Sequence, residues 1–250
     1  MTHDLFRQDA YLRECSAQLT VITEAGIVLD RTVFYPLGGG QAGDSGVLVL
    51  ADGTAIAIAD TRKGKDAEGH PTSDIVHIPA PGQEALLAAL TVSMPVTARI
   101  DWDRRHRMMR LHTTSHLLCH VVPQLVNGCS ITPDYARLDF AMTDPLDKDQ
   151  LTAGIAALVV AAHPITVASI SDEELDANPS LVKSMSVQPP RGTGRIRTIR
   201  IGGEGDGPLI DLQPCGGTHV ANTSEIGAVI VTKIEKKSAT TRRVVLGFAA

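Results

Sequence analysis

The feature that most limits the possible folds of this sequence is a change of pattern near residue 96. Before it, the chain contains short runs rich in β-branched residues, bounded by Gly, Pro and Asp-Gly, and no long helical pattern. These runs are 17–26, 26–36, 45–63 and 73–79. Runs of this kind between turn-forming residues are typical of strands. About six strands without a long helix predict a small β-barrel over residues 1–96.

Beyond residue 96, helical and strand patterns alternate. A helix is expected over 104–126, because Met108, Leu111, Leu118 and Val122 recur at helical spacing, with a break at Pro123. The other predicted elements are helices at 148–163 and 172–178 and strands at 96–102, 135–142, 164–170, 195–202, 227–237 and 242–248, with a loop at 188–194. Residues 97–250 are therefore predicted to be an α+β domain, with helices packed on a mostly antiparallel sheet.

Hydropathy and charge limit the classes of protein to which this chain can belong. The chain has 43% hydrophobic and 20% charged residues and a formal net charge of −5. Its longest apolar run, 151–162, is shorter than the roughly 18 residues of a membrane span, and no secretory leader is visible, so we expect a cytoplasmic protein. Residues 99–110 carry five arginines against two aspartates, and residues 191–250 are also basic. These local segments are compatible with a restricted nucleic-acid surface.

Two short motifs indicate a metal site. Thr-Thr-Ser separates His112 from His116 on the predicted helix, and Gly-Gly-Thr separates Cys215 from His219. Histidines at i and i+4 share one helix face, and one cysteine with three histidines suits tetrahedral zinc. Each motif alone arises often by chance, but the two together favour Zn²⁺. The first motif lacks the glutamate of the H-E-x-x-H peptidases, which excludes that class.

The neighbouring cysteines and histidines are expected to have other roles. Four cysteines in 250 residues do not form a disulfide framework. Cys119 lies about 10 Å along the helix from His112, too far to share one ion. We expect Cys119 to pack in the core, His120 to lie in the core or at its edge, and His106 to face RNA or solvent.

The combined motifs resemble a known family. H-T-T-S-H followed by Q-P-C-G-G-T-H resembles the signature of the alanyl-tRNA synthetase editing domain. Further segments that resemble this family are 34–46, 100–118, 136–140, 186–202 and 211–227. The resemblance covers roughly residues 18–248. Because 250 residues leave no room for an aminoacylation core, the chain resembles the free-standing AlaX type in its medium-length form.

The resemblance implies a fold and an activity. It implies a translation-protein-like barrel at 1–96 and, at 97–250, a zinc-containing two-layer α+β sandwich of the threonyl/alanyl-tRNA synthetase editing type. The implied activity is hydrolysis of Ser-tRNA(Ala), with Gly-tRNA(Ala) as a second candidate, by a protein that is a monomer or a weak dimer. The implied zinc ligands are His112, His116, Cys215 and His219.

Several residues are candidates for catalysis. A glutamine often found in the family before the R-x-D-F strand is replaced here by Ser130. Ser130 or Thr132 is expected to contact a substrate serine, or else only to form a loop. Asp211 is expected either to orient a ligand imidazole or to cap a turn, and Asp44 either to orient a ligand imidazole or to hold its own loop. Since four ligands close a zinc site, Cys215 or His219 is expected to be loosely held, or zinc only orients the substrate.

The expected substrate contacts lie in a glycine-rich loop and in the basic segments. The loop residues Gly38, Gly39, Gly40 and Gln41 would bring backbone amides to the terminal adenosine, or would only form a strained turn beside Asp44. The arginines expected to meet phosphates, or alternatively solvent, are Arg104, Arg105, Arg107, Arg191, Arg195 and Arg197. Few aromatic residues are present, so stacking platforms for bases are not expected.

Two other classes of function remain open from the sequence. One is a zinc-stabilised tRNA-binding module without catalysis, which a closed four-ligand site would suit. The other is a zinc hydrolase of a small ester or amide. The basic segments beside both metal motifs favour RNA over the small substrate.

Overall fold

The computed structural model describes residues 1–186, 188–189, 194–203, 205 and 207–249. Its chain divides into two compact units, Met1–His106 and Arg107–Ala250. The division falls later than the boundary predicted after residue 96. The reason is that strand β8 (Pro95–Ile100) pairs with strands on both of its sides within the first unit.

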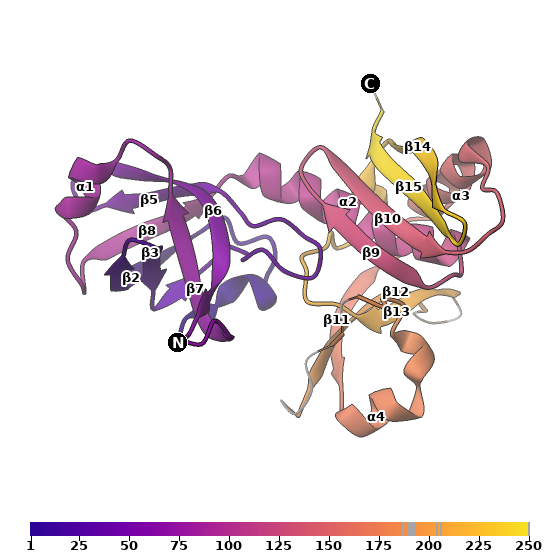
Figure 1. The fold of residues 1–250 in the computed structure, drawn as a ribbon, viewed down its shortest axis with the longest axis horizontal. Helices are drawn as coiled ribbons and strands as arrows, with labels where there is room; N and C mark the ends of the chain where they lie inside the picture. The colour runs from indigo at the N-terminus through magenta and orange to yellow at the C-terminus, as the bar shows by residue number, and fades with distance from the viewer. Residues whose placement is uncertain (187, 190–193, 204, 206, 250) are drawn as a thin grey trace. The chain divides into compact units, whose positions relative to one another are not determined.

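Six antiparallel strands of the first unit close into a barrel (Figure 1). In barrel order they are β2 (Glu14–Thr23), β3 (Gly26–Leu29), β7 (Pro71–Pro79), β6 (Ala55–Lys65), β5 (Gly46–Leu50) and β8. Alternate side chains of each strand point inward, so Ile56 and Ile58 of β6 join Leu19, Leu48 and Ala98 in one buried core. Short elements complete the unit: β1 (His3–Asp4), η1 (Leu5–Arg7), β4 (Arg31–Thr32) and α1 (Glu84–Ala88).

The second unit contains two antiparallel sheets (Figure 1). One has the order β14 (Val229–Ser238), β15 (Thr241–Phe248), β10 (Tyr135–Ala141) and β9 (Val126–Ile131). The other has the order β11 (Ile165–Ile170), β12 (Ile196–Gly202) and β13 (Leu209–Pro214). The helical elements are α2 (Trp102–Val121), which begins in the first unit, α3 (Lys148–Val160), α4 (Asp172–Ala177), η2 (Pro179–Leu181) and η3 (Thr223–Ile226). Helix α3 packs against β14.

The mixture of helices and strands agrees with the predicted α+β class, but two strands beside the metal motifs were not predicted. Helix α2 ends at Val121, ahead of Pro123, and not at residue 126 as expected. The next residues form β9, because β10 supplies backbone partners for a segment that contains Asn and Gly. Strand β13 forms in the same way against β12. Among the described residues, no helix is both long and apolar enough to cross a membrane.

A buried histidine makes the stability of the barrel dependent on pH. The His77 side chain is fully buried, its Nδ1 donates to the Ile27 carbonyl at 3.0 Å, and its Nε2 accepts from Thr32 Oγ1 at 2.8 Å. Burial lowers the pKa of His77 from 6.5 to about 4. Between these values the unfolded chain binds more protons than the folded one, so stability falls as the pH falls. The loss at pH 5, relative to pH 8, is about 2 kcal/mol.

Denaturant unfolding at pH 5 and pH 7, followed by the fluorescence of Trp102, measures this effect. Trp102 is the one tryptophan of the chain and packs on the barrel core. The variant His77→Gln is expected to be less stable at pH 7 and to lose most of the acid dependence. An equal pH dependence in variant and parent would show that another group is responsible.

Candidate metal centre

Helix α2 is buried over most of its length, although its sequence is polar. From Met108 to Cys119 every residue is buried except Arg110. Two of the three hydroxyls of the Thr-Thr-Ser segment are satisfied inside the helix: Thr114 Oγ1 donates to the Arg110 carbonyl at 2.8 Å, and Ser115 Oγ donates to the Leu111 carbonyl at 2.9 Å. Hydroxyls that bond one turn back can be buried at little cost, so this polar stretch forms a central helix.

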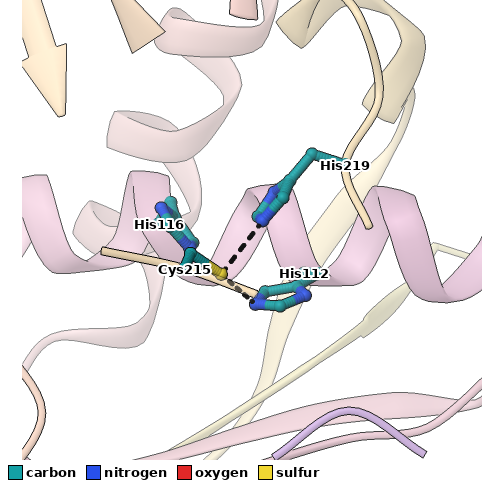
Figure 2. Close-up of side chains that lie close together, drawn as sticks. All are labelled: His112, His116, Cys215 and His219. Atoms are coloured by element: carbon teal, nitrogen blue, oxygen red, sulfur yellow. Dashed lines mark hydrogen bonds between the residues drawn. The ribbon is translucent and has the colours of Figure 1, made fainter. Parts of the chain in front are cut away.

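The four predicted zinc ligands come together in one cluster (Figure 2). His112 and His116 project from α2, and Cys215 and His219 lie in the segment after β13. One ligand atom from each lies within 4.8 Å of the others. Cys215 Sγ is 3.5 Å from His112 Nε2 and 3.3 Å from His219 Nε2. The residue Cys215 is half-buried, and the three histidines are buried.

An arginine holds the Cys215–His219 segment in place. Arg197 on β12 donates through Nη1 to the carbonyls of Cys215, at 2.6 Å, and Gly217, at 3.0 Å. The Cys215 amide donates back to the Arg197 carbonyl at 3.2 Å. Neither Gly216 nor Gly217 has a positive φ. The bonds from Arg197 give the turn its shape.

Two histidines of the cluster are held in orientation by contacts at Nδ1. His116 Nδ1 donates to Asp211 Oδ2 at 2.8 Å, and the other carboxylate oxygen accepts from Lys183. His219 Nδ1 lies 3.2 Å from Thr113 Oγ1. Bonds at Nδ1 fix each ring with Nε2 toward the cluster, as is usual for metal-binding histidines. Asp211 therefore orients a ligand, one of the two roles expected for it.

The charges of the cluster shift the pKa of its members. Burial opposes ionisation of Cys215, but the charges of His112 and His219 bring the pKa of its thiol well below the usual value. Burial likewise opposes the charged form of His116, but the hydrogen bond to Asp211 raises the pKa of His116 to about 9. Burial and the charge of His112 lower the pKa of His219 to about 3. A metal ion requires the thiolate and neutral imidazoles, so binding of an ion displaces the proton that the Asp211 hydrogen bond stabilises on His116.

The donor set and its spacing fit Zn²⁺. Tetrahedral zinc, with bonds of about 2.3 Å to sulfur and 2.0–2.1 Å to nitrogen, separates these atoms by about 3.6 Å. The two sulfur–nitrogen distances of 3.5 and 3.3 Å lie close to that value. His112, His116, Cys215 and His219 would therefore hold the ion.

Asp211 is expected to tune the affinity for zinc. Asp211→Asn keeps the shape but weakens the bond to His116, and loss of such a partner lowers metal affinity by about 10- to 100-fold. Competition with a chelator measures it. Asp139→Asn is the matched control, because Asp139 is equally buried at 2% exposure but pairs with Arg243 and Lys237. Equal losses of affinity in both variants would count against a specific role for Asp211.

Comparison with known proteins identifies the family of the chain. Residues 196–245 match the family described as threonyl and alanyl tRNA synthetase second additional domain, and residues 8–104 match class II (A) tRNA synthetases. The alanyl-tRNA editing protein AlaX-M of Saccharolobus solfataricus is 32% identical over 249 residues, which cover 98% of both chains. The chain belongs to the AlaX-M family of alanyl-tRNA editing proteins. AlaX-M of Methanosarcina acetivorans is also 32% identical, over 97% of both chains.

The AlaX-M family is related to a larger enzyme. The alanine–tRNA ligase of Metallosphaera sedula is 33% identical over 244 residues. The alignment covers 94% of this AlaX-M chain but 25% of the ligase.

In this member of the AlaX-M family, Thr132 has the loop-forming role, one of the two considered for it, and Ser130 lies in a strand, while contact of either hydroxyl with a substrate stays a prediction. Thr132 Oγ1 donates to the Tyr135 carbonyl at 3.0 Å and accepts the amides of Asp134 and Tyr135, so it is used within the β9–β10 turn. In β9, Cys129 pairs with the buried Leu138, and strand alternation turns Ser130 to the opposite face. The charge of Cys215 acts on Cys129, whose pKa is raised chiefly by burial. Cys129 therefore lies close enough to the cluster to interact with its charges, a placement not predicted from the sequence because β9 was not expected to be a strand.

The neighbouring side chains of α2 behave largely as expected. Cys119 is buried, and burial raises the pKa of its thiol to about 12, as for a packing residue. His120 is exposed, unlike the expected core or edge histidine, and its Nδ1 donates to the Ile210 carbonyl at 2.8 Å. His106 stacks on Trp102, with ring centroids 5.3 Å apart.

The glycine-rich loop of this AlaX-M chain forms a tight turn. Gly38 and Gln41 exchange backbone hydrogen bonds of 3.1 and 3.0 Å, and Gly39 and Gly40 between them have positive φ. A side chain at either position would be strained, so the turn alone accounts for these two glycines. The Gln41 side chain is buried. A role of the loop in substrate binding stays a prediction.

The expected contact between Arg105 and tRNA is wrong. Arg105 has no exposed surface, its Nε donates to both carboxylate oxygens of Asp44 at 3.0 Å, and its Nη2 donates to the Val33 carbonyl at 2.7 Å. Asp44 also accepts the Tyr35 amide at 2.6 Å. A fully buried, paired guanidinium cannot reach RNA. Asp44 therefore holds its own loop, one of the two roles considered for it.

The other predicted arginines have different surroundings. Arg104 is half-buried and donates to the Gly43 carbonyl at 3.2 Å. Arg195 is exposed, and its Nε donates to Ser169 Oγ at 2.6 Å. Arg197 holds the metal-binding turn, as described above. Arg191 and most of the loop predicted at 188–194 lie outside the described residues.

Proposed function

We propose that this protein is a trans-editing hydrolase that removes serine from Ser-tRNA(Ala), with Gly-tRNA(Ala) as a second candidate substrate. The observation that carries the proposal is the four-donor cluster, with ligand atoms within 4.8 Å, in a chain that aligns with AlaX-M over 98% of its length. We place the reaction at this cluster.

The reaction breaks an aminoacyl ester on a terminal ribose hydroxyl. Zn²⁺ bound at the cluster would supply Lewis-acid polarisation of the ester carbonyl or a lowered pKa of water, and either role requires that Cys215 or His219 give up its position on the ion. The chain's own residues hold the metal ligands in place. Asp211 and Lys183 fix His116, Thr113 fixes His219, and Arg197 fixes the turn that carries Cys215. A site held by such outer contacts is suited to orient a substrate within fractions of an ångström.

The two units are proposed to divide this task. We assign the barrel of the first unit to a translation-protein-like domain and the second unit to an editing sandwich that contains zinc. The extents of the family matches support this, since residues 8–104 fall within the first unit and residues 196–245 within the second. We further propose that the protein acts in the cytoplasm, as a monomer or a weak dimer.

The comparison of three substrates tests the proposal against its alternatives. Zinc-loaded protein is mixed with Ser-tRNA(Ala), with serine ethyl ester and with uncharged tRNA(Ala). We expect rapid deacylation of the charged tRNA and little hydrolysis of the free ester. Binding of tRNA without deacylation would indicate a zinc-stabilised binding module. Equal hydrolysis of the free ester would indicate a small-molecule hydrolase.

A further inference from the structure

Two arginines of α2 stack on one aromatic ring at the end of β15. The guanidinium carbon of Arg107 lies 4.3 Å from the ring centroid of Phe248, and that of Arg110 lies 4.4 Å from the same centroid. Stacking on an aromatic face fixes the plane of a guanidinium group. All three residues belong to the second unit.

Both guanidinium groups are anchored through the same atom. Arg107 Nε donates to the Pro133 carbonyl at 2.8 Å, and Arg110 Nε donates to the Ile226 carbonyl at 2.7 Å. A Cβ added at Gly227 would lie 2.9 Å from Arg110 Nη2, so this glycine leaves room for the second group. The anchoring at Nε leaves the forked Nη ends of both groups to meet a ligand.

The pair has little compensating negative charge. Within the described part of the chain, Arg110 forms no ion pair, and Arg107 has a single distant one, 3.9 Å from an Asp134 carboxylate that is 84% exposed. Burial and the charge of Arg107 lower the pKa of Arg110, which shows that the two positive charges act on each other. Two like charges that act on each other are destabilising, and an anion bound to both would offset the repulsion.

We propose that Arg107, Arg110 and Phe248 form a clamp for a phosphodiester group of tRNA. Forked Nη donors match the oxygens of a phosphate, and arginine binds phosphate in bidentate fashion. The inference that the phosphate belongs to tRNA rests on the proposed function. Arg110 and His112 are two residues apart on α2, about 200° around the helix, so the clamp faces away from the metal cluster. It binds the body of the tRNA and not the acyl ester.

The double variant Arg107→Gln/Arg110→Gln tests the clamp in the zinc-loaded full chain. The measurement is the dissociation constant of uncharged tRNA(Ala) over a series of salt concentrations. We expect affinity to fall at least about 10-fold at low salt and the slope of log K against log [salt] to decrease by about 1 to 2. Arg107→Lys/Arg110→Lys keeps the charge but not the fork, so it should restore the salt slope and only part of the affinity.

Matched controls separate the clamp from a general loss of charge. Lys148→Gln/Lys236→Gln removes two exposed positive charges from the same unit and is expected to change affinity less than about 3-fold. Zinc content and thermal melting show whether each variant is folded. If Arg107→Gln/Arg110→Gln does not fold, Arg107→Lys/Arg110→Lys is used to test the clamp in its place. The clamp would be overturned if Arg107→Gln/Arg110→Gln bound tRNA(Ala) with the affinity of the parent or with that of the control Lys148→Gln/Lys236→Gln.

The same experiment distinguishes the clamp from the proposed function. If the parent binds tRNA(Ala) through these arginines but does not deacylate Ser-tRNA(Ala), the clamp stands and the hydrolase is wrong. If the parent deacylates Ser-tRNA(Ala) and the arginine variant binds tRNA equally well, the hydrolase stands and the clamp is wrong. If the parent does not bind tRNA(Ala) at all, both are wrong.

Discussion

Replacing Cys215 by alanine is expected to remove tightly bound zinc and to abolish deacylation of Ser-tRNA(Ala). Cys215 supplies the only sulfur of the cluster, and both nearest imidazole nitrogens lie within 3.5 Å of it. Removal of a direct ligand lowers metal affinity more than removal of a residue that only supports a ligand does, so zinc affinity should fall by more than about 100-fold. Metal content after dialysis and chelator competition measure the loss.

Cys15→Ala is the matched control for this prediction. Cys15 is half-buried like Cys215 but lies on β2 in the first unit. The control should keep full zinc content and full activity. A Cys215→Ala protein that retains zinc at the affinity of the parent would show that the three histidines alone hold the ion. Full activity in that variant would place the chemistry elsewhere.

Asp44→Asn is expected to destabilise the barrel by about 3–5 kcal/mol, because it leaves the buried Arg105 charge without a counter-charge. The Arg105 side chain is 0% exposed and that of Asp44 is 1% exposed, so water cannot solvate the remaining charge. Denaturant unfolding followed by Trp102 fluorescence measures the change in the free energy of unfolding. The double variant Asp44→Asn/Arg105→Met removes the unpaired charge and should recover part of the loss.

The exposed ion pair between Glu14 and Arg99 provides the control in the same barrel. Its groups are 2.7 Å apart and both are 54% exposed. Glu14→Gln should therefore cost less than about 1 kcal/mol. If Asp44→Asn costs no more than Glu14→Gln, the buried pair is not a main support of the barrel, and the structural role assigned here to Arg105 fails.

The metal ligands could be predicted because their signal is local. Histidines four residues apart share a helix face whatever the rest of the fold does, and a Cys-Gly-Gly-Thr-His segment can form a turn in many contexts. The helix α2 that carries two of them was predicted from the spacing of Met108 and Leu111, both of which are fully buried.

The surroundings of the ligands could not be predicted, because they depend on distant partners. Strands β9 and β13 have weak strand patterns and form because β10 and β12 pair with them. Arg104 and Arg105 are equivalent in sequence, but only Arg105 reaches Asp44, which lies 61 residues earlier in the chain. Which arginine is buried and which meets RNA depends on the rotation of the helix in the fold.

Single-turnover deacylation by the zinc-loaded protein, with Ser-tRNA(Ala) and Ala-tRNA(Ala) compared side by side, tests the central claim most directly. A site that binds the serine hydroxyl leaves its own polar groups unpaired when alanine enters, so it should discriminate by at least about 100-fold. The account predicts rapid loss of serine, with alanine spared, and no reaction in Cys215→Ala. Equal hydrolysis of both tRNAs, or hydrolysis of neither, would contradict it.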